Sequence, residues 1–172
     1  MHVRDLPEIL QRCVGVDEMG YEVSRPFRRG DHIYATDQRI VVRMPLPAEE
    51  IEGLGTGRVP PVESQAWDVS LYRERASDLP EIPPPSVVPC RCVEDFLHGD
   101  TSSCEDCGGT GEVLQYTEVQ IEDMWFSSLY LDMLAATGAQ LYLPLSGICP
   151  ARFAGEGFEG LLMNCGPPED MR

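Results

Sequence analysis

Two different spacings of apolar residues occur along the chain, and they predict different elements. In residues 5–14, DLPEILQRCV, apolar side chains recur every three or four positions, which is the pattern of an amphipathic helix. Pro7 suits the first turn of this helix, and Gly15 suits its end. Residues 127–137 repeat the pattern, with Gly138 as a stop. The sequence therefore predicts an amphipathic helix in each of these two segments.

Runs of β-branched and aromatic residues predict short antiparallel strands after each helix. Residues 33–36 and 39–43 have the composition of a hairpin, with Asp37 and Gln38 in its turn. Further strands are expected between residues 112 and 126, and in the segments 139–146, 149–156 and 158–165. The order contains no alternation of single strands and helices, so we expect an α+β fold of two similar halves, each a helix packed on antiparallel strands.

Composition divides the chain into four parts. The stretch from Met44 to Pro89 holds nine of the fifteen prolines, so it reads as a long connection interrupted by one short helix around Glu63 to Ala76. Four cysteines follow at once. The predicted parts are the first half (residues 1–45), the Pro-rich connection (46–89), a zinc-binding insertion (90–111) and the second half (112–172).

The cysteine spacing is typical of a metal site. Cys90 and Cys92 are separated by one residue, and Cys104 and Cys107, eleven residues further on, by two. Four thiolates complete the tetrahedron that Zn²⁺ prefers, and the glycines after Cys107 allow a tight turn behind the ion. A closed four-sulfur site has no open coordination position, so the zinc would be structural. His98 could replace one ligand, and the alternatives are four reduced cysteines in a loop or a redox pair.

Residues 104–111 match C-x-x-C-x-G-x-G and so resemble the repeat of DnaJ-type chaperones. The resemblance covers one copy of that repeat, and the His-Pro-Asp signature of a J-domain does not occur in the chain. It therefore implies the zinc-binding geometry and not the chaperone activity.

Charge limits the function classes. The formal net charge is −16, which disfavours a general nucleic-acid binder because phosphates repel a net anion. The excess lies downstream: residues 1–45 hold seven Arg against seven acids, and residues 46–172 hold six against twenty-two. Candidate nucleic-acid contacts are Arg12, Arg25, Arg28 and Arg29, although a charged strand edge would also explain the last three.

Other signals are missing from the sequence. No segment approaches the roughly 20 apolar residues of a membrane span, and the N-terminus lacks a signal-peptide core, so we expect a cytoplasmic protein with reduced cysteines. The three histidines lie far apart, and neither a P-loop nor a Gly-x-Ser-x-Gly motif occurs. We therefore expect no enzymatic activity, although an active site assembled from distant residues would leave no such motif.

Two segments outside the cysteines resemble bacterial sliding clamps, the processivity factors of replicative polymerases. Residues 33–45, IYATDQRIVVRMP, are similar to a clamp hairpin, and residues 147–165, GICPARFAGEGFEGLLMNC, to the closing strands of a clamp domain. The resemblance implies a domain of two related halves. Since this chain has room for one such domain, a ring would need about six copies as a homo-oligomer.

The function expected from these features is a non-enzymatic, clamp-like binding module with a structural zinc site. It would serve as a DNA-replication accessory or a protein-interaction factor, with a protein partner and at most weak DNA binding, because the two helices offer few cations. The alternative is a zinc-ribbon adaptor that has no link to replication.

Overall fold

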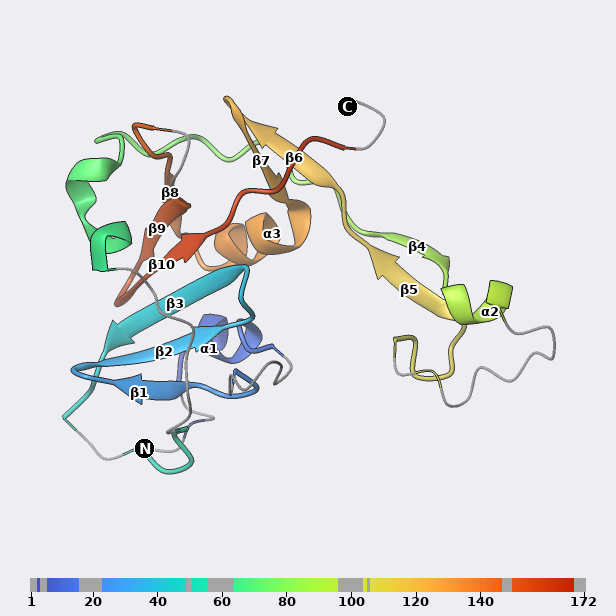
Figure 1. The fold of residues 1–172 in the computed structure, drawn as a ribbon, viewed down its shortest axis with the longest axis horizontal. Coiled ribbons are helices and arrows are strands. Elements are labelled where there is room, and N and C mark those ends of the chain that lie inside the picture. The colour runs from blue at the N-terminus through green and yellow to red at the C-terminus, as the bar shows by residue number, and fades with distance from the viewer. Residues whose placement is uncertain are drawn as a thin grey trace.

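The structure is a computed structural model and has an α+β fold with antiparallel sheets and few helices (Figure 1). It describes residues 3, 6–15, 23–48, 51–55, 64–95, 104, 106–146 and 150–168. The elements are α1 (Glu8–Arg12), β1 (Phe27–Arg29), β2 (His32–Thr36), β3 (Ile40–Pro45), the 3₁₀ turns η2 (Ser64–Trp67) and η3 (Val69–Leu71), β4 (Ser86–Pro89), α2 (Arg91–Asp95), β5 (Glu112–Gln115), β6 (Glu118–Ile121), β7 (Met124–Ser127), α3 (Ser128–Ala136), β8 (Gln140–Tyr142), β9 (Ala151–Gly155) and β10 (Phe158–Leu162).

Six strands form the main sheet in the order β1-β2-β3-β10-β9-β8, and every neighbouring pair is antiparallel. The central pair joins β3 to β10, with Ile40 opposite Leu162 and Arg43 opposite Glu159. One sheet is therefore built from both ends of the chain. The predicted hairpin is confirmed as β2 and β3, and strands occur in all the segments where the sequence predicts them.

The turn between β2 and β3 is held by side chains. Asp37 Oδ1 accepts the backbone N–H groups of Arg39 at 2.9 Å and of Ile40 at 3.0 Å. The hydroxyl of Thr36 accepts the N–H of Gln38 at 3.0 Å and donates to the carbonyl of Ile40 at 2.7 Å. These bonds keep Gln38 at a φ of 77°, where glycine is the usual residue.

Helices α1 and α3 pack on one face of the sheet and share one hydrophobic core with it. Ile9 and Leu10 of α1, and Leu131 and Leu134 of α3, belong to one buried cluster with the sheet residues Ile33, Ala35, Ile40, Val42, Leu141, Ala151, Phe153 and Leu162. Burying a side chain of this kind contributes about 1.5–3 kcal/mol. Strand alternation sends the intervening side chains, including Tyr34 and Arg43, to the opposite face.

The ends of the helices differ in part from the prediction. α1 is shorter than the apolar pattern of residues 5–14, because it begins after Pro7 and ends at Arg12, before the buried Cys13. α3 ends as predicted before Gly138, which has a φ of 65°. The hydroxyl of Ser128 does not cap the helix but accepts a hydrogen bond from the N–H of Thr117 at 3.0 Å, which ties the start of α3 to the loop between β5 and β6.

The Pro-rich connection crosses the molecule and pairs with both outer strands of the sheet. Beside β1, Arg28 N–H donates to the carbonyl of Gly55 at 3.2 Å. Beside β8, Ser77 N–H donates to the carbonyl of Leu141 at 2.8 Å, and Arg73 N–H to that of Leu143 at 2.9 Å. Backbone groups at both edges of the sheet therefore already have partners.

β4 and β5 form a separate two-stranded ribbon that projects from the body and carries α2 at its far end (Figure 1). We call residues 86–115 the arm. In the part of the chain that the structure describes, no helix is long and apolar enough to cross a membrane.

Candidate metal centre

The two strands of the arm bring the four cysteines together. The register of the ribbon ends with Pro89 opposite Glu112, and the N–H of Cys90 donates to the carbonyl of Gly111 at 2.8 Å. This bond places the start of α2 beside the turn that follows Cys104. Two-stranded ribbons are at best marginally stable in water without further support, so the tip of the arm needs an additional cross-link.

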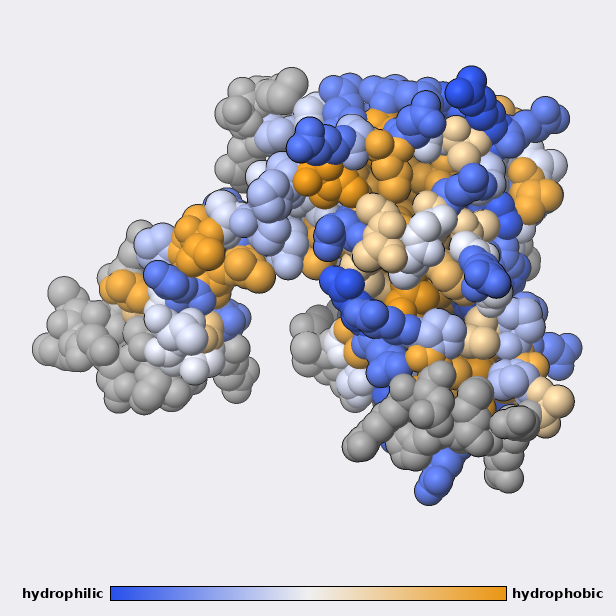
Figure 2. All heavy atoms as spheres, turned by 180° about the vertical axis from the view of Figure 1, so that it is seen from behind, coloured by the Kyte–Doolittle hydropathy of each residue, from blue (hydrophilic) through white to orange (hydrophobic). Residues whose placement is uncertain are grey.

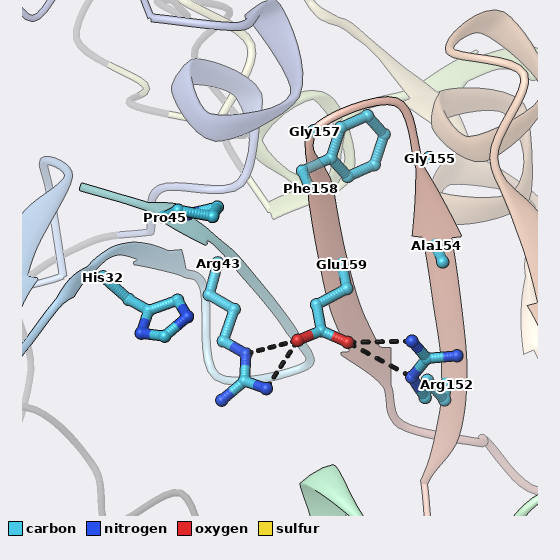
Figure 3. Close-up of a pocket in the computed structure, with 9 residues that line it drawn as sticks. All are labelled: His32, Arg43, Pro45, Arg152, Ala154, Gly155, Gly157, Phe158 and Glu159. Atoms are coloured by element: carbon cyan, nitrogen blue, oxygen red, sulfur yellow. Dashed lines mark hydrogen bonds and ion pairs between the residues drawn. The ribbon is translucent and has the colours of Figure 1, made fainter. Parts of the chain in front are cut away.

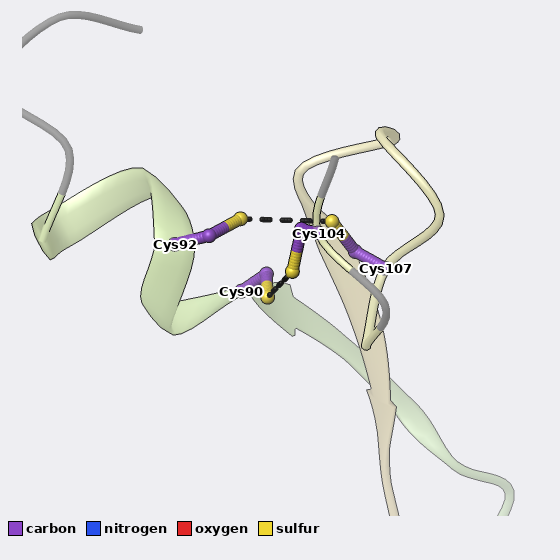
Figure 4. Close-up of side chains that lie close together, drawn as sticks. All are labelled: Cys90, Cys92, Cys104 and Cys107. Atoms are coloured by element: carbon purple, nitrogen blue, oxygen red, sulfur yellow. Dashed lines mark hydrogen bonds between the residues drawn. The ribbon is translucent and has the colours of Figure 1, made fainter. Parts of the chain in front are cut away.

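The four sulfur atoms lie within 4.8 Å of one another (Figure 4). The Sγ atoms of Cys90 and Cys104 are 3.7 Å apart, and those of Cys92 and Cys107 are 3.6 Å apart. A disulfide would need about 2.05 Å. Sulfurs bound tetrahedrally at about 2.3 Å from one ion would be roughly 3.8 Å apart. The arrangement is therefore compatible with a metal site.

The turn behind Cys107 has the geometry that the glycines predict. Its three glycines all have positive φ: 57° at Gly108, 90° at Gly109 and 74° at Gly111. Thr110 closes the turn, because its N–H donates to the carbonyl of Cys107 at 3.1 Å and its hydroxyl to the same carbonyl at 2.8 Å. The backbone consequently folds tightly behind the sulfur.

The pKa values of the thiols are pushed in opposite directions. Burial raises the pKa of Cys92, and hydrogen bonds with the neighbouring cysteines add to the increase. Burial also opposes ionisation of Cys107, but the N–H groups of Gly111 and Gly109 and the thiol of Cys92 outweigh it and lower its pKa to about 6. A sulfur that binds a metal ion has to be deprotonated, and these backbone donors favour the thiolate form of Cys107.

The proposed replacement ligand, His98, lies outside the described residues, so that alternative stays open. Of the three isolated cysteines, Cys13 is buried in the core, and burial beside Asp37 raises its pKa to about 12. Cys165 is half-buried, and Cys149 lies outside the described residues.

Three of the four candidate nucleic-acid contacts lie in or just before β1, and the fourth, Arg12, lies in α1. Arg28 and Arg29 are neighbours in β1 and so point to opposite faces of the edge strand. Arg25 is exposed in the bend before β1. Arg12, on the exposed side of α1, approaches Glu8 to 3.9 Å. Contact between these residues and nucleic acid stays a prediction.

A further polar cluster, which the sequence did not single out, lies on the sheet face away from the helices (Figure 3). Glu159 Oε1 accepts the Nε of Arg43 at 2.8 Å, and its Oε2 accepts the Nη2 of Arg152 at 2.9 Å. Trp67 of η2 stacks on the Arg43 guanidinium, whose Cζ is 3.7 Å from the ring centroid. Arg43, Arg152 and Glu159 are each the single charged residue of an otherwise apolar strand. An isolated charge in an apolar strand was the signal by which the sequence could have identified them. Strand alternation cannot pair residues 116 positions apart.

Comparisons with protein-family models, with curated proteins and with solved structures found no match to this chain.

Proposed function

We propose that the chain is a non-enzymatic binding module whose arm is held in shape by a structural Zn²⁺ ion. The main observation in support of this proposal is the spacing of the four cysteine sulfurs, which is 3.6 and 3.7 Å in the two closest pairs. Zn²⁺ is the ion proposed because soft thiolates in a tetrahedral set favour it over the oxygen-seeking Mg²⁺ and Ca²⁺. Four protein ligands would leave no position for a substrate, so the ion would not be catalytic.

The arm is proposed as the surface that contacts a protein partner. Val87 and Leu114 face each other across the ribbon and are 60% and 56% exposed, and Val93 of α2 is 48% exposed. Figure 2 shows apolar side chains gathered on the arm where it leaves the body. The segment 86–115 also carries six acidic residues against one arginine. An apolar patch in an acidic setting favours a partner with a basic, partly apolar surface.

The clamp-like character of the body is also part of the proposal. α1 is followed by β1, β2 and β3, and α3 by β8, β9 and β10. The sheet order is symmetric about its centre, where the third strand of one set pairs with the third strand of the other. This arrangement supports an internal duplication like that of a sliding-clamp domain, and hence an accessory role in DNA replication in the cytoplasm.

A zinc-ribbon adaptor without a link to replication is the second candidate. The observation in its favour is that the Pro-rich connection pairs with both outer strands, at Gly55 and at residues 72–77. A ring closed by strand pairing between copies would have to displace these segments.

Elemental analysis and light scattering test the two parts of the proposal separately. Purified protein should contain about one zinc per chain, and Cys107→Ser should lose it while Cys165→Ala keeps it. A folded protein that contains no metal in either form would refute the zinc site. A closed oligomer would favour the clamp-like role, whereas a monomer with no affinity for DNA at low salt would favour the adaptor.

A further inference from the structure

The Arg43–Glu159–Arg152 cluster carries more positive than negative charge. Two guanidinium groups share one carboxylate, and although burial opposes its ionisation, hydrogen bonds from both arginines lower the pKa of Glu159, so it stays charged at neutral pH. The cluster therefore has a net charge of about +1. Among the described residues that line the pocket around the cluster, Glu159 is the one acidic residue, and His32 lines the pocket as well.

The excess charge is partly withdrawn from water. The side chains of Arg43 and Arg152 are only 18% and 17% exposed, which is low for arginine. Each uses its Nε and Nη2 on Glu159, and for neither does an Nη1 group have an acceptor among the described residues. In Figure 3 these Nη1 groups point away from the carboxylate. A half-buried cation with unused donors is stabilised by an additional anion.

The two guanidinium groups are held in place before any ligand arrives. Arg43 lies between Glu159 and the ring of Trp67, and the Arg152 Cζ is 5.5 Å from the ring centroid of Tyr142. Arginines that are already fixed lose little conformational entropy when they bind a ligand. This site should therefore bind an anion more tightly than a set of mobile surface arginines would.

The pocket has room for a small ligand. Its volume is about 340 Å³, and Gly155, Gly157 and Phe158 at the β9–β10 turn form the wall above the cluster (Figure 3). This is near the lower end of the range for small-molecule sites. Arginine N–H groups match the oxygens of phosphate in geometry, and a histidine at the rim adds a further donor.

We propose that this pocket binds the phosphate group of a small anionic ligand, with Arg43 and Arg152 as its anchors and His32 at the rim. A small phosphate is favoured over a nucleic acid, because the net charge of −16 repels a polyanion more strongly than a single phosphate. The pocket lies on the body of the protein, and the proposal does not depend on the zinc site or on the clamp-like role.

Calorimetric titration of the full chain at low salt tests the site with three probes: inorganic phosphate, adenosine monophosphate and a single-stranded oligonucleotide. We expect inorganic phosphate or adenosine monophosphate to bind saturably with a Kd below about 10 mM. Which of the two binds distinguishes a site for free phosphate from a site for a nucleotide. Binding of none of the probes would overturn the proposal, and binding of the oligonucleotide alone would replace the small ligand with a nucleic acid.

Variants distinguish a built site from general charge. Arg152→Gln should weaken binding roughly tenfold, whereas Arg75→Gln, which removes the same charge from an exposed position in the Pro-rich connection, should leave it unchanged. Equal weakening by both would mean non-specific attraction and would overturn the site. If Arg152→Gln fails to fold, Glu159→Gln decides: it frees donors and adds positive charge, so tighter binding is expected, and unchanged or weaker binding would contradict the proposal.

Discussion

The hydroxyl of Tyr130 in α3 donates to Asp37 Oδ2 at 2.6 Å, although the two residues are 93 positions apart. The other carboxylate oxygen of Asp37 already organises the β2–β3 turn through two backbone N–H groups. One side chain thus connects the β2–β3 hairpin to the helix that precedes the last three strands. Burial, followed by the contact with Asp37, raises the pKa of Tyr130.

Replacing Tyr130 by Phe should destabilise the fold by about 1.5–3 kcal/mol, because a hydrogen bond to a charged and partly buried group is lost. Urea denaturation of both proteins measures the difference in the free energy of unfolding. Tyr142→Phe is the matched control, since the Tyr142 hydroxyl bonds to Gln140 at an exposed position, and its effect should stay within about 0.5 kcal/mol. Equal losses in the two variants would mean that the hydrogen bond to Asp37 stabilises the fold no more than an exposed one does.

Gly160→Ala in β10 should destabilise the centre of the sheet. A Cβ atom at this position would lie 2.0 Å from Cζ of Phe153 and 2.5 Å from the carbonyl oxygen of Val41. Overpacking of this kind costs about 1–3 kcal/mol, and the backbone carbonyl cannot move aside without disturbing β3. Thermal unfolding gives the loss. Phe153→Leu in the same chain should recover only part of it, because the contact with Val41 remains.

The pH dependence of stability should include a contribution from Glu159. Its pKa is lowered in the folded protein because the hydrogen bonds from Arg43 and Arg152 outweigh the effect of burial. The stabilisation is therefore present above the unfolded pKa of about 4.3 and is lost as the pH falls through the lower folded value. The free energy of unfolding should fall more steeply below about pH 5 in the natural protein than in Glu159→Gln.

Glu118→Gln, an exposed change in β6, controls for the loss of one charge in that experiment. Denaturation between neutral pH and about pH 3 supplies the curves. If the free energy of unfolding depends on pH in the same way in the natural protein and in Glu159→Gln, the predicted contribution of Glu159 is contradicted.

Removal of the proposed Zn²⁺ ion by a chelator should loosen the arm and leave the body folded. The ribbon has little buried surface of its own, whereas Val42 lies in the main core. Hydrogen exchange should then speed up at the amides of Val88 and Val113, which form a hydrogen-bonded pair of the ribbon, while the amide of Val42 stays protected. Loss of protection at all three positions would mean that the arm and the sheet fold as one unit.

The sequence predicted the local elements well, because their signals are local. The β-branched and aromatic runs at residues 33–36 and 39–43 identified the hairpin, and the spacing of the cysteines identified the cluster at the arm's tip. What stabilises the β2–β3 turn was not predictable in the same way. Asp37 and Thr36 replace the glycine that the backbone conformation would ordinarily call for.

The order of strands in the sheet and the arginine cluster could not be predicted from local sequence patterns. Arg43 and Glu159 become neighbours only because β3 pairs with β10, and no periodicity within either strand specifies that partner. The Pro-rich connection was expected to be extended, but its pairing at Gly55 and Ser77 depends on where the sheet ends. Such contacts follow from tertiary packing.

The pairing of β3 with β10 also bears on the order in which the protein forms during synthesis. The sheet cannot be completed until residues 158–162 have left the ribosome, and contacts of such long sequence separation form slowly. The cysteines of the arm, at 90 to 107, emerge earlier and are close together in the chain. We therefore expect the arm to fold first, around the proposed Zn²⁺ ion, while the two groups of strands that form the sheet are still apart.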